Sequence, residues 1–420
     1  MKSLNSSRIL MLLENNPYPG DLRVRREALS LVKAGYQVTV ISPGKKKLRR
    51  YETVDGVHVY RFPAPVPGDG FLGYLWEYGY SITASFFLTL WVFFRHGFDV
   101  IHAHNPPDLF VLVAMFYRLL GKRFVFDHHD LSPEMYNARF RQGGNRLVVQ
   151  ALIFFEKLTC RLADGVIATN ESYRRMEMER GNVPPERITI VRNGPDLNRI
   201  KRVEPDAALR DKATTILGFV GLMGQQDGVD YYLRALHHLI HDLQRDDFYA
   251  VIIGRGDAVN SLKQLTTELG LDDRVHFTGR IPDAEMLRYL STADICVDPD
   301  PSNPFNDRST MIKMMDYMAL AKPIVAFDLP EHRTTAQAAA LYARPNDELD
   351  FARKIVTLMD DPQLRRSMGA SGRRRIEDEL AWHHQEEHLL QAYKKLRLVA
   401  RRGKERTVAD CPAVVTVQNK

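Results

Sequence analysis

Short apolar runs and longer amphipathic runs alternate along nearly the whole chain, and this alternation stops once and then starts again. Residues 8–13 and 37–42 are typical apolar runs, and residues 23–34 between them have helical periodicity. Alternating strands and helices are the pattern of a parallel sheet that is covered by helices on both faces. Turn-forming and charged residues interrupt the pattern near 196–213. The sequence therefore predicts an α/β protein with two Rossmann-like halves joined by a linker.

The apolar runs also predict where the elements lie. In the first half we expect strands at 8–13, 37–42, 57–62, 99–102, 123–127, 165–169 and 187–191, and helices at 23–34, 74–95, 108–120, 145–163 and 172–181. In the second half we expect strands at 215–220, 248–253, 274–278, 295–297 and 323–327, with helices between them. The chain has 420 residues, and a single core seldom grows beyond about 300 residues. We therefore expect domains at 1–200 and 201–380, a helix over 381–406 with Trp382 as its anchor, and a disordered tail over 407–420.

Charge and cysteine content narrow the class of protein. Lysine plus arginine number 58 and aspartate plus glutamate 52, so the net charge is +6. A mildly basic chain suits an anionic small substrate or an anionic membrane surface, whereas a nucleic-acid partner would need a denser basic stripe. Cys160, Cys296 and Cys411 form no close pair in the sequence. We therefore expect no disulfide framework, and a cytoplasmic location.

Residues 303–328 combine a polar loop, a helix and an apolar strand, and they give the strongest indication of a site. Ser309 is a good N-cap, so we expect the helix to begin there. Helix N-termini favour anions, and Arg308 and Lys313 would add positive charge, which suits a diphosphate. Asp316, two turns further on, could accept hydrogen bonds from ribose hydroxyls. The alternative is a helix with a methionine face in the core and a solvated polar face.

Gly20 lies between the first predicted strand and a helix that carries several arginines. A glycine at such a turn lets a phosphate approach the backbone. Arg23, Arg25 and Arg26 follow within the first turns of that helix. They indicate either an anion site or a solvated helix face.

The strand at 123–127 ends in the segment FDHHDLSPE. Ligands of open α/β sheets bind beyond the carboxyl ends of the strands, so His129, Asp130 and Glu134 are candidate site residues. A metal site is the competing interpretation. However, adjacent side chains such as those of His128 and His129 point to opposite faces of a strand and cannot both bind one ion. We therefore expect no metal.

In the second half, glycines follow two predicted strands in GFVGLMGQQDG and VIIGRGD. Gly224 and Gly254 could open space for a nucleotide there, although a single GxG is a weak signal. In HFTGRIPDAEM, the turn at Gly279 leads into a helix, and its backbone could line a pocket for a base.

Seven blocks occur in an order that resembles glycosyltransferase family 4. They are PYPGDLRVRREALSLVKAGYQVTVISP, DVIHAHNPPD, FDHHDLSPE, IVRNGPDL, GLMGQQDGVDYYLRAL, HFTGRIPDAEMLRYLSTADICVDPD and NDRSTMIKMMDYMALAKPIVAFD. The resemblance covers residues 8–395. It implies a metal-independent, retaining enzyme of GT-B architecture, in which two domains face each other across a cleft and the C-terminal helix crosses back to the first domain. The branch that it most resembles belongs to bacterial polysaccharide, O-antigen and capsule clusters and transfers amino-sugars such as N-acetylfucosamine or N-acetylglucosamine.

The resemblance also implies contacts with a nucleotide-sugar donor. Gly20 matches the glycine whose amide contacts the donor phosphate, and His129 matches the histidine near the transferred sugar. Asn193 matches the asparagine of the NG pair that ends the first domain. The remaining predicted donor contacts, for the base, the diphosphate and the ribose, are Gly224, Gly254, Gly279, Arg280, Ile281, Ser309, Thr310, Met311 and Asp316.

Two departures from the family pattern concern charge. The family has a glutamate, seven residues and a second glutamate, whereas this chain has Arg308 and Asp316 at those positions. Asp316 keeps a carboxylate for ribose, but Arg308 does not replace what the first glutamate does for the donor sugar. The family often has an arginine and a lysine in the loop that matches GLMGQQDG, and this chain has Leu222 or Met223 and Asp227 in their places.

The charge of a leaving diphosphate must be balanced by the protein. We infer that Arg308, Lys313 and either Arg23 or Arg26 balance it. Loss of Lys313 would then lower kcat by at least ~10²-fold.

The expected reaction is a front-face transfer with retention, in which an oxocarbenium-like centre forms and the acceptor hydroxyl enters from the side of the leaving group. The residues predicted to act in catalysis are His129, Asp130, Lys313 and Arg308. Those predicted to position the acceptor are Asp21, Arg26 and Glu134. The donor is expected to be a UDP-linked sugar and the acceptor a glycan or a polyprenyl-linked glycan, with no cofactor and no nucleic-acid partner.

The aromatic-rich segment 71–94 has two interpretations. We favour a buried crossover helix because the segment is almost continuously apolar. The alternative is a surface that dips into a membrane to reach a lipid-linked sugar, with KKKLRR at 45–50 attracting anionic lipids. That alternative predicts a peripheral protein on the inner face of the cell membrane.

Two other classes of function remain open. A nucleotide-sugar 2-epimerase of the same architecture would use the same cleft without an acceptor. A catalytically silent partner in a polysaccharide assembly complex would bind a nucleotide without turning it over.

Overall fold

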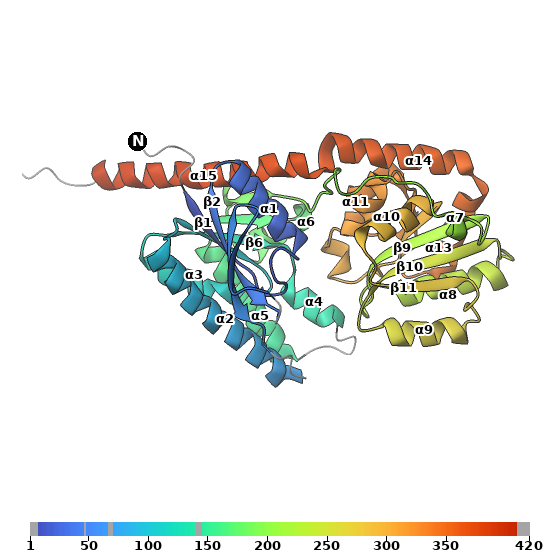
Figure 1. The fold of residues 1–420 in the computed structure, drawn as a ribbon, viewed down its shortest axis with the longest axis horizontal. Helices are drawn as coiled ribbons and strands as arrows, with labels where there is room; N and C mark the ends of the chain where they lie inside the picture. Colours follow the sequence, from blue (N-terminus) through green and yellow to red (C-terminus); the bar gives the residue numbers. More distant parts are fainter. Residues whose placement is uncertain (1–6, 46–47, 66–69, 140–144, 410–420) are drawn as a thin grey trace, which may run out of the picture.

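The computed structural model describes residues 7–45, 48–65, 70–139 and 145–409, which form two sheets with helices on both faces of each (Figure 1). The first sheet has eight strands and the second has six. The prediction of an α/β fold with two Rossmann-like halves is confirmed. We call the part up to β8 the first half and the part from β9 to α14 the second half.

The first sheet has the strand order β3-β4-β2-β1-β5-β6-β7-β8. All its neighbouring strands are parallel except β3 and β4. Those two form a hairpin at Asp55 and Gly56, which both have positive φ, as a two-residue DG turn requires. The strands are β1 (Arg8–Leu12), β2 (Gln37–Gly44), β3 (Tyr51–Val54), β4 (Val57–Pro63), β5 (Val100–His104), β6 (Arg123–His128), β7 (Gly165–Ala168) and β8 (Ile188–Ile190).

Alternate residues of these strands supply two separate cores. In β1, Leu10 packs on the side of α2, α3 and α5, whereas Met11 packs on the side of α1 and the C-terminal helix, as the two-residue period of a strand requires. The helices of the first half are α1 (Leu22–Lys33), α2 (Gly70–Arg95), α3 (Phe110–Leu119), α4 (Ser132–Arg139), α5 (Arg146–Leu162) and α6 (Glu171–Glu179).

The second sheet has the parallel order β11-β10-β9-β12-β13-β14. Its strands are β9 (Thr215–Leu222), β10 (Phe248–Arg255), β11 (Val275–Gly279), β12 (Ile295–Asp298), β13 (Ile324–Phe327) and β14 (Ala340–Ala343). Its helices are α7 (Ala207–Arg210), α8 (Val229–His241), α9 (Val259–Glu268), α10 (Asp283–Thr292), α11 (Ile312–Ala319), α12 (Pro330–Ala336), α13 (Glu348–Asp360) and α14 (Pro362–Arg375).

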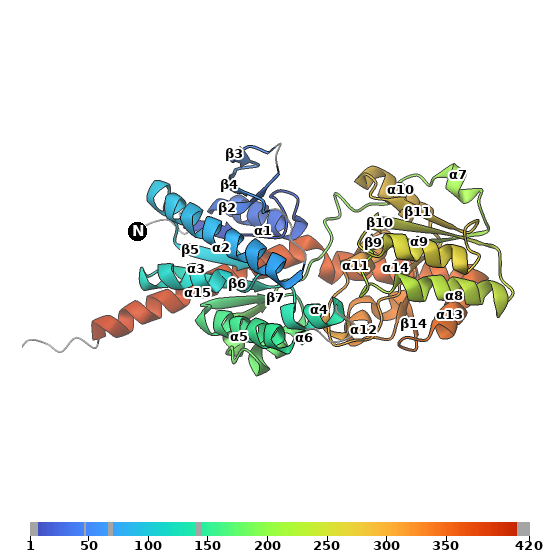
Figure 2. The same cartoon turned by 90° about the horizontal axis from the view of Figure 1, so that it is seen from below.

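The chain returns to the first half through α15 (Trp382–Ala409), which runs along the first half in Figures 1 and 2, whereas α14 lies on the second half. The indole Nε1 of Trp382 donates a hydrogen bond to Ser30 Oγ at 3.0 Å. At the crossing, a Cβ on Gly194 would lie 1.8 Å from the carbonyl oxygen of Leu380, so only glycine fits. The predicted crossing of the C-terminal helix is confirmed. This helix continues to Ala409, and the rest of the predicted disordered tail lies outside the described residues.

The structure corrects several predicted elements. The strands β3 and β14 and the helix α4 were absent from the prediction. The helix predicted to begin at Ser309 begins at Ile312, with Met311 as its N-cap. The favoured interpretation of 71–94 as a buried helix is wrong for one of its faces, because Trp91 and Phe94 of α2 are exposed. Among the described residues, no helix has the length and apolarity that a membrane span needs.

Candidate functional site

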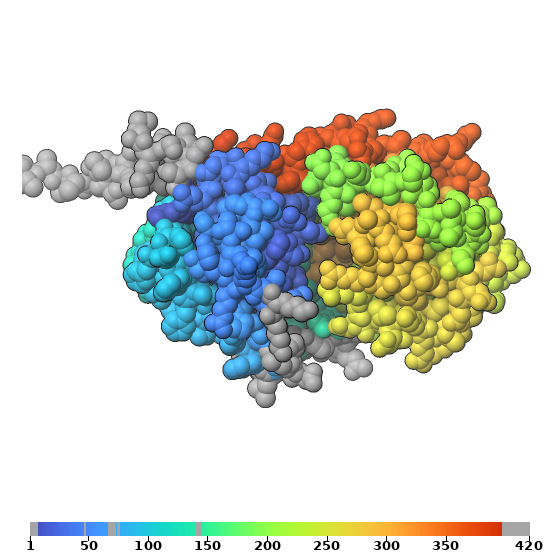
Figure 3. All heavy atoms as spheres, viewed as in Figure 1, coloured from blue at the N-terminus to red at the C-terminus, as the bar shows by residue number. Residues whose placement is uncertain are grey.

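A hollow separates the two halves on the face seen in Figure 3, and contacts next to the strand ends join them. Asn170, directly after β7, donates through Nδ2 to the backbone oxygen of Arg308 at 2.8 Å and to Thr310 Oγ1 at 2.9 Å. Ser172 donates to Glu331 Oε1 at 2.6 Å. Candidate residues from both halves therefore line one cleft.

A buried ion pair lies at the carboxyl end of β6. The Asp127 carboxylate accepts from Nε and Nη2 of Arg23, each at 2.8 Å. Arg23 also donates to Asn193 Oδ1 at 2.9 Å and lies 3.2 Å from Glu27. Every arm of its guanidinium is therefore engaged. The Asp127 carboxylate already neutralises the charge of Arg23, and contact of Arg23 with a donor diphosphate stays a prediction.

Asp127 also organises two histidines. Its Oδ2 lies 3.0 Å from His104 Nδ1, and its Oδ1 lies 3.5 Å from His129 Nδ1. Burial would lower the pKa of His129, but the Asp127 carboxylate outweighs burial and raises this pKa. Burial would raise the pKa of Asp127, yet Arg23 and the two histidines hold it well below its ordinary value. The cleft end of β6 therefore carries an imidazole whose charged form is favoured by a fixed anion.

Asn105, in the loop after β5, fixes the backbone around His129. Its Oδ1 accepts from the amides of His129 at 2.8 Å and Asp130 at 3.1 Å, and its Nδ2 donates to the Asp130 carbonyl at 2.6 Å. Burial raises the pKa of Asp130, and the neighbouring His129 opposes this rise. His129 and Asp130 are thus brought together beside the cleft, as predicted.

His128 has a different environment from its neighbour. Its Nδ1 lies 3.2 Å from Glu177, within the core between α5 and α6. Burial lowers the pKa of His128 to about 3, so this ring is neutral. The two adjacent histidines therefore point in different directions, as the geometry of a strand requires.

The predicted diphosphate site at Ser309 is closed. Ser309 Oγ donates to the Phe305 carbonyl at 2.9 Å and lies 3.2 Å from the hydroxyl of Tyr173 in the first half. A short 3-10 turn at Asn306–Arg308 precedes an extended segment, which delays the start of α11. The prediction that the helix begins at Ser309 is therefore wrong, and anion binding by Ser309, Thr310 and Met311 stays a prediction.

Lys313 is buried between two carboxylates at the end of β12. Its ammonium lies 3.2 Å from Asp298 and also donates to Asp300. Burial alone would lower the pKa of Lys313, but these carboxylates raise it. The charge of Lys313 is already balanced by these carboxylates, and its role in holding the diphosphate stays a prediction.

The glycines that were predicted to contact the donor differ in how much space surrounds them. The Gly20 amide donates to the Pro17 carbonyl at 2.7 Å, so this amide is used inside its own turn. A Cβ on Gly254 would lie 1.9 Å from the Gly221 carbonyl oxygen, so Gly254 lets the ends of β9 and β10 pack together. The Gly224 amide donates to Asp227 Oδ2 at 2.6 Å. Of these positions only Gly279, with φ +68 and no atom within 4 Å of an added Cβ, faces open space.

Arg26 and Asp316 face each other from the two halves. Nε of Arg26 donates to the Leu22 carbonyl at 3.1 Å, Nη1 donates to the Gly194 carbonyl, and the guanidinium lies 5.1 Å from the Trp382 ring centre. Within the described part of the chain, no carboxylate lies within ion-pair distance of Arg26. Burial lowers the pKa of Arg26 to about 10, and Asp316 opposes this shift. Arg26 is therefore a charged group that has no carboxylate partner at the cleft.

Asp316 is half-buried on the side of α11 opposite its buried methionines Met314, Met315 and Met318. Burial raises the pKa of Asp316 to about 6, although Arg26 and Arg199 act to lower it. The predicted methionine core face is confirmed. Its opposite face presents a carboxylate to the first half instead of to bulk water.

Four further predicted residues lie around this pair. Arg308 donates to the Pro304 carbonyl at 2.5 Å and is half-buried. Asp21 accepts from the amides of Arg23 and Val24 as the N-cap of α1. Glu134 lies 2.6 Å from Arg180, which gives it a structural ion pair instead of the predicted acceptor contact. Arg280 and Ile281 follow the open turn at Gly279.

Two buried clusters have the side chains of a metal site, and in each the ligand atoms lie within 4.8 Å of one another. They consist of Glu27, His102, His104 and Asp127, and of Asp298, Asp300 and His332. Arg23 and Lys313 respectively place a positive charge against their carboxylates. That charge does part of what a metal ion would do. Metal independence stays a prediction.

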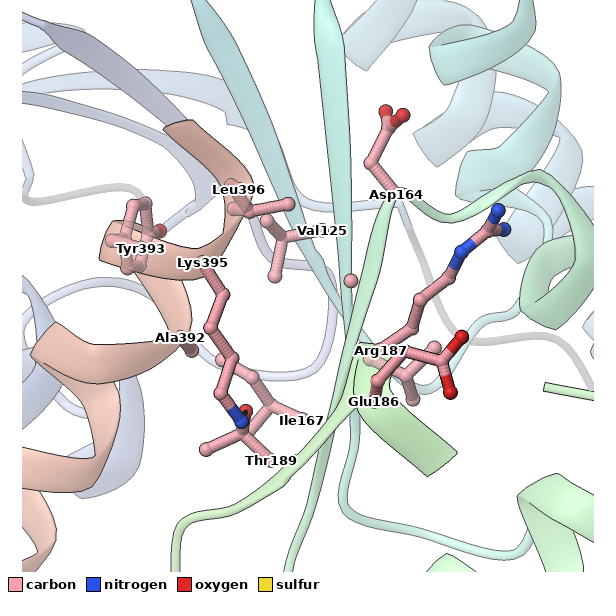
Figure 4. Close-up of a pocket in the computed structure, with 12 residues that line it drawn as sticks. Val125, Asp164, Ile167, Glu186, Arg187, Thr189, Ala392, Tyr393, Lys395 and Leu396 are labelled. Carbon is pink, nitrogen blue, oxygen red and sulfur yellow. Dashed lines mark hydrogen bonds between the residues drawn. The ribbon is translucent and has the colours of Figure 1, made fainter. Parts of the chain in front are cut away.

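A separate pocket of about 230 Å³ lies away from the cleft, where α15 crosses the sheet (Figure 4). Tyr393 and Leu396 of α15 line one wall, and Ile167 and Thr189 of the sheet line the other. The Tyr393 hydroxyl forms a hydrogen bond with Nδ1 of the buried His102 at 2.9 Å. We assign this pocket to the docking of α15.

Sequence reasoning missed Glu27, His104, Asn105 and Asp127. A signal was present, because HAHN lies at the carboxyl end of β5 just as DHHD lies at the carboxyl end of β6. Polar residues at the carboxyl ends of two adjacent parallel strands meet in space. What the sequence did not reveal is that Arg23 neutralises this cluster from α1.

Comparisons with known proteins agree with this geometry. Residues 22–199 match the family model described as Glycosyltransferase Family 4, and residues 214–361 match the model described as Glycosyl transferases group 1. Similar proteins include the 2-deoxystreptamine glucosyltransferase of Streptomyces kanamyceticus, which is 22% identical over 92% of this chain and 99% of its own length. The alpha-maltose-1-phosphate synthase of Mycolicibacterium smegmatis is 27% identical over 66% of this chain and 74% of its own.

Two solved structures share the fold. Sucrose-phosphate synthase from Thermosynechococcus elongatus superposes with a TM-score of 0.76 at 18% identity, over 94% of this chain and all of its own. Anabaena HepE in complex with UDP and glucose superposes with a TM-score of 0.69 at 16% identity, over 92% of this chain and 99% of its own. These solved structures show that the chain has the GT-B fold. By its two family matches the protein is a glycosyltransferase of the GT4 type.

Proposed function

We propose that the protein transfers a sugar, with retention, from a UDP-linked donor that binds between its halves to a hydroxyl group of a glycan or a polyprenyl-linked glycan. The observation that carries the proposal is the pair of Arg26 and Asp316, a cation without a carboxylate partner and a carboxylate on opposite walls of one cleft. A nucleoside diphosphate offers the complementary groups. The ribose hydroxyls would donate to Asp316, and the diphosphate would take up the charge of Arg26.

In the proposed reaction, each group acts where charge changes. Arg26, helped by Arg308, balances the charge that grows on the leaving diphosphate. The His129 imidazolium, held by Asp127, orients the transferred sugar at the end of β6. Asp130 lies next to His129 and would accept hydrogen bonds from the acceptor. As the sugar–phosphate bond breaks, the acceptor oxygen bonds to the anomeric carbon and its proton leaves with the diphosphate.

Several finer points belong to this proposal. The UDP specificity is supported by HepE, a similar fold solved with UDP and glucose. An N-acetylamino-sugar donor, a role in cell-surface polysaccharide synthesis and metal-independent turnover rest on the sequence resemblance. The proposed location, in the cytoplasm at the inner face of the cell membrane, also rests on the sequence resemblance.

Product analysis tests the proposed reaction. The protein is incubated with a panel of UDP-sugars, with and without a lipid-linked glycan, while UDP release and the anomeric configuration of the product are measured. A transferase of the proposed kind releases UDP faster with the acceptor and forms a product whose configuration equals that of the donor. An epimerase would convert the donor without an acceptor, and a silent partner would bind UDP without turnover. Inversion of configuration would also contradict the proposal.

We expect Arg26→Gln to weaken UDP binding by about 10-fold to 100-fold, because one charge-assisted contact with phosphate is lost. Calorimetric titration with UDP measures the effect. Arg333→Gln is the matched control, since Arg333 is an exposed arginine paired with Asp328 in the second half. The control should bind UDP like the wild type. Equal affinity of Arg26→Gln and wild type would remove Arg26 from the donor site.

We expect UDP affinity to rise with pH as Asp316 ionises. Its pKa is raised to about 6, so at pH 5 the carboxyl is protonated and can accept less strongly from ribose. Because the shift is upward from 3.8, the free energy of unfolding of the free protein falls as pH rises from about 4 to about 6 and is then independent of the Asp316 ionisation. The measurement compares wild type with Asp316→Asn between pH 5 and 7.5, since the ionisation of UDP itself affects both alike. Parallel pH profiles would exclude Asp316 from the site.

A further inference from the structure

The helices on one face of the first half turn large apolar side chains outward. Of the 17 large apolar residues that are exposed in the described chain, 11 lie on α2, α3 and α5 or directly after α3, and only two lie in the second half. We call the outward stripes of these three helices the apolar face. An exposed apolar patch of this kind usually marks an interaction site.

The helix α2 buries hydroxyl groups on its inner side and exposes aromatic rings on its outer side. Ser81, Ser85 and Thr89, spaced four residues apart, are fully buried against the sheet, and the hydroxyls of Ser85 and Thr89 have no hydrogen-bond partner among the described residues. Trp91 and Phe94 are meanwhile 60% and 80% exposed. In water, a helix is favoured when it buries its aromatic side. Val92 and Phe93 of α2 also pack in the core, but the exposed aromatic rings indicate that the outer face of α2 meets an environment less polar than water.

The neighbouring helices continue this face. In α3, Leu112, Met115, Phe116 and Leu119 are exposed at the i, i+3, i+4, i+7 spacing of one helical stripe. In α5, Leu147 and Phe154 are exposed one heptad apart. The three helices pack in the order α2, α3, α5, and all three are visible on the same side in Figure 2.

The charges around the apolar face are mostly positive. Arg95, Lys122 and Arg161 lie at the ends of the three helices, and none of them has a carboxylate within ion-pair distance among the described residues. The helices themselves contain two acidic residues, Glu77 and Glu156. Glu156 is buried and paired with Arg180. An apolar face with a basic margin complements the surface of a membrane with anionic lipids.

We propose that the apolar face docks the protein on the surface of a bilayer that contains anionic lipids, with the aromatic residues of α2 at the interface. Tryptophan and other aromatic side chains favour this depth of a membrane. A second copy of the chain is a poorer occupant, because a two-fold dimer through this face would bring its basic margin close to itself.

This inference deepens the proposed function at one point, the lipid-linked acceptor. The first turns of α2 and of α5 lie towards the cleft, since Glu77 lines a small pocket with Glu14 and Gly44 at the strand ends, and the Asn145 amide donates to Tyr136 of α4. A docked protein would therefore meet the glycan head of a membrane-anchored acceptor at the cleft edge. Docking itself needs neither donor nor turnover.

Vesicle flotation with the full chain tests the proposal. We expect the wild type to float with vesicles of phosphatidylcholine and phosphatidylglycerol, and to float less at high salt or without phosphatidylglycerol. The triple variant Phe87→Ser/Trp91→Ser/Phe94→Ser should bind at least about tenfold more weakly, because the apolar contribution to interfacial binding is lost. These side chains are exposed, so thermal unfolding should be little changed.

Leu222→Ser is the matched control, because Leu222 is 64% exposed on the second half and its loss should leave flotation unchanged. Light scattering gives the oligomeric state of the wild type and the triple variant. Flotation of the triple variant equal to that of the wild type would overturn the proposal. So would a wild-type dimer that the triple variant dissociates and that fails to float. If the wild type floats normally but transfers no sugar, that result would count against the proposed function and not against membrane docking.

Discussion

Replacing His129 with glutamine should lower kcat by about 10²–10³-fold and leave the fold intact. The imidazole lies at the cleft end of β6, and the Asp127 carboxylate, 3.5 Å away, raises its pKa and favours the charged form. Glutamine can still form a hydrogen bond but supplies no positive charge. Steady-state kinetics with saturating donor measure the loss, and the KM for the donor should change much less than kcat. A kcat within threefold of wild type would remove His129 from the reaction.

His128→Ala provides the matched comparison at the adjacent position. The His128 ring is neutral and buried against Glu177, so its loss should lower the free energy of unfolding by about 1–3 kcal/mol. Activity per folded molecule should stay near that of the wild type. If both variants lost activity equally at equal stability, the distinction between a cleft histidine and a core histidine would fail.

Replacing Lys313 with methionine should destabilise the protein by about 3–5 kcal/mol, the usual cost of removing one partner from a buried ion pair. The substitution leaves the buried carboxylates of Asp298 and Asp300 without their cation. Burial and Asp298 already raise the pKa of Asp300 well above its ordinary value. Urea unfolding followed by circular dichroism measures the change. This outcome replaces the expectation that loss of Lys313 lowers kcat alone.

Two companion variants make this result specific. Lys263→Met alters an exposed lysine of α9 and should change stability by less than about 0.5 kcal/mol. The double variant Lys313→Met/Asp300→Asn removes one of the two opposed carboxylates and should recover part of the loss. A destabilisation of Lys313→Met below about 1 kcal/mol would show that its ion pairs contribute little.

The sequence predicted the parts of the fold that depend on local pattern. Apolar runs located the parallel strands from β1 to β13, because a strand that is buried on both faces has few polar residues. The methionine stripe of α11 was correct for the same reason. The strands β3 and β14 were missed because they lie at the sheet edges and are short, and β3 alternates exposed with half-buried residues.

The site was harder to predict, because its chemistry depends on partners distant in the sequence. The sequence predicted that Arg23 is free to bind a diphosphate, but the carboxylate of Asp127, 104 residues away in the sequence, neutralises its charge. The sequence predicted that Ser309 is a helix N-cap with a free hydroxyl, but in the structure this hydroxyl contacts Tyr173. Arg26 was the reverse case, since it lay in a cluster of arginines and is left without a carboxylate where the halves meet. Tertiary contacts decide which basic side chains are neutralised by carboxylates inside the protein, and a local sequence pattern does not contain these contacts.

A crystal structure with bound UDP tests the central claim most directly, namely that one nucleotide is held by both halves. We predict that the ribose hydroxyls lie within hydrogen-bond distance of the Asp316 carboxylate and that a phosphate oxygen lies within ion-pair distance of the Arg26 guanidinium. A nucleotide bound outside the cleft, or one that contacts neither Asp316 nor Arg26, would contradict this account.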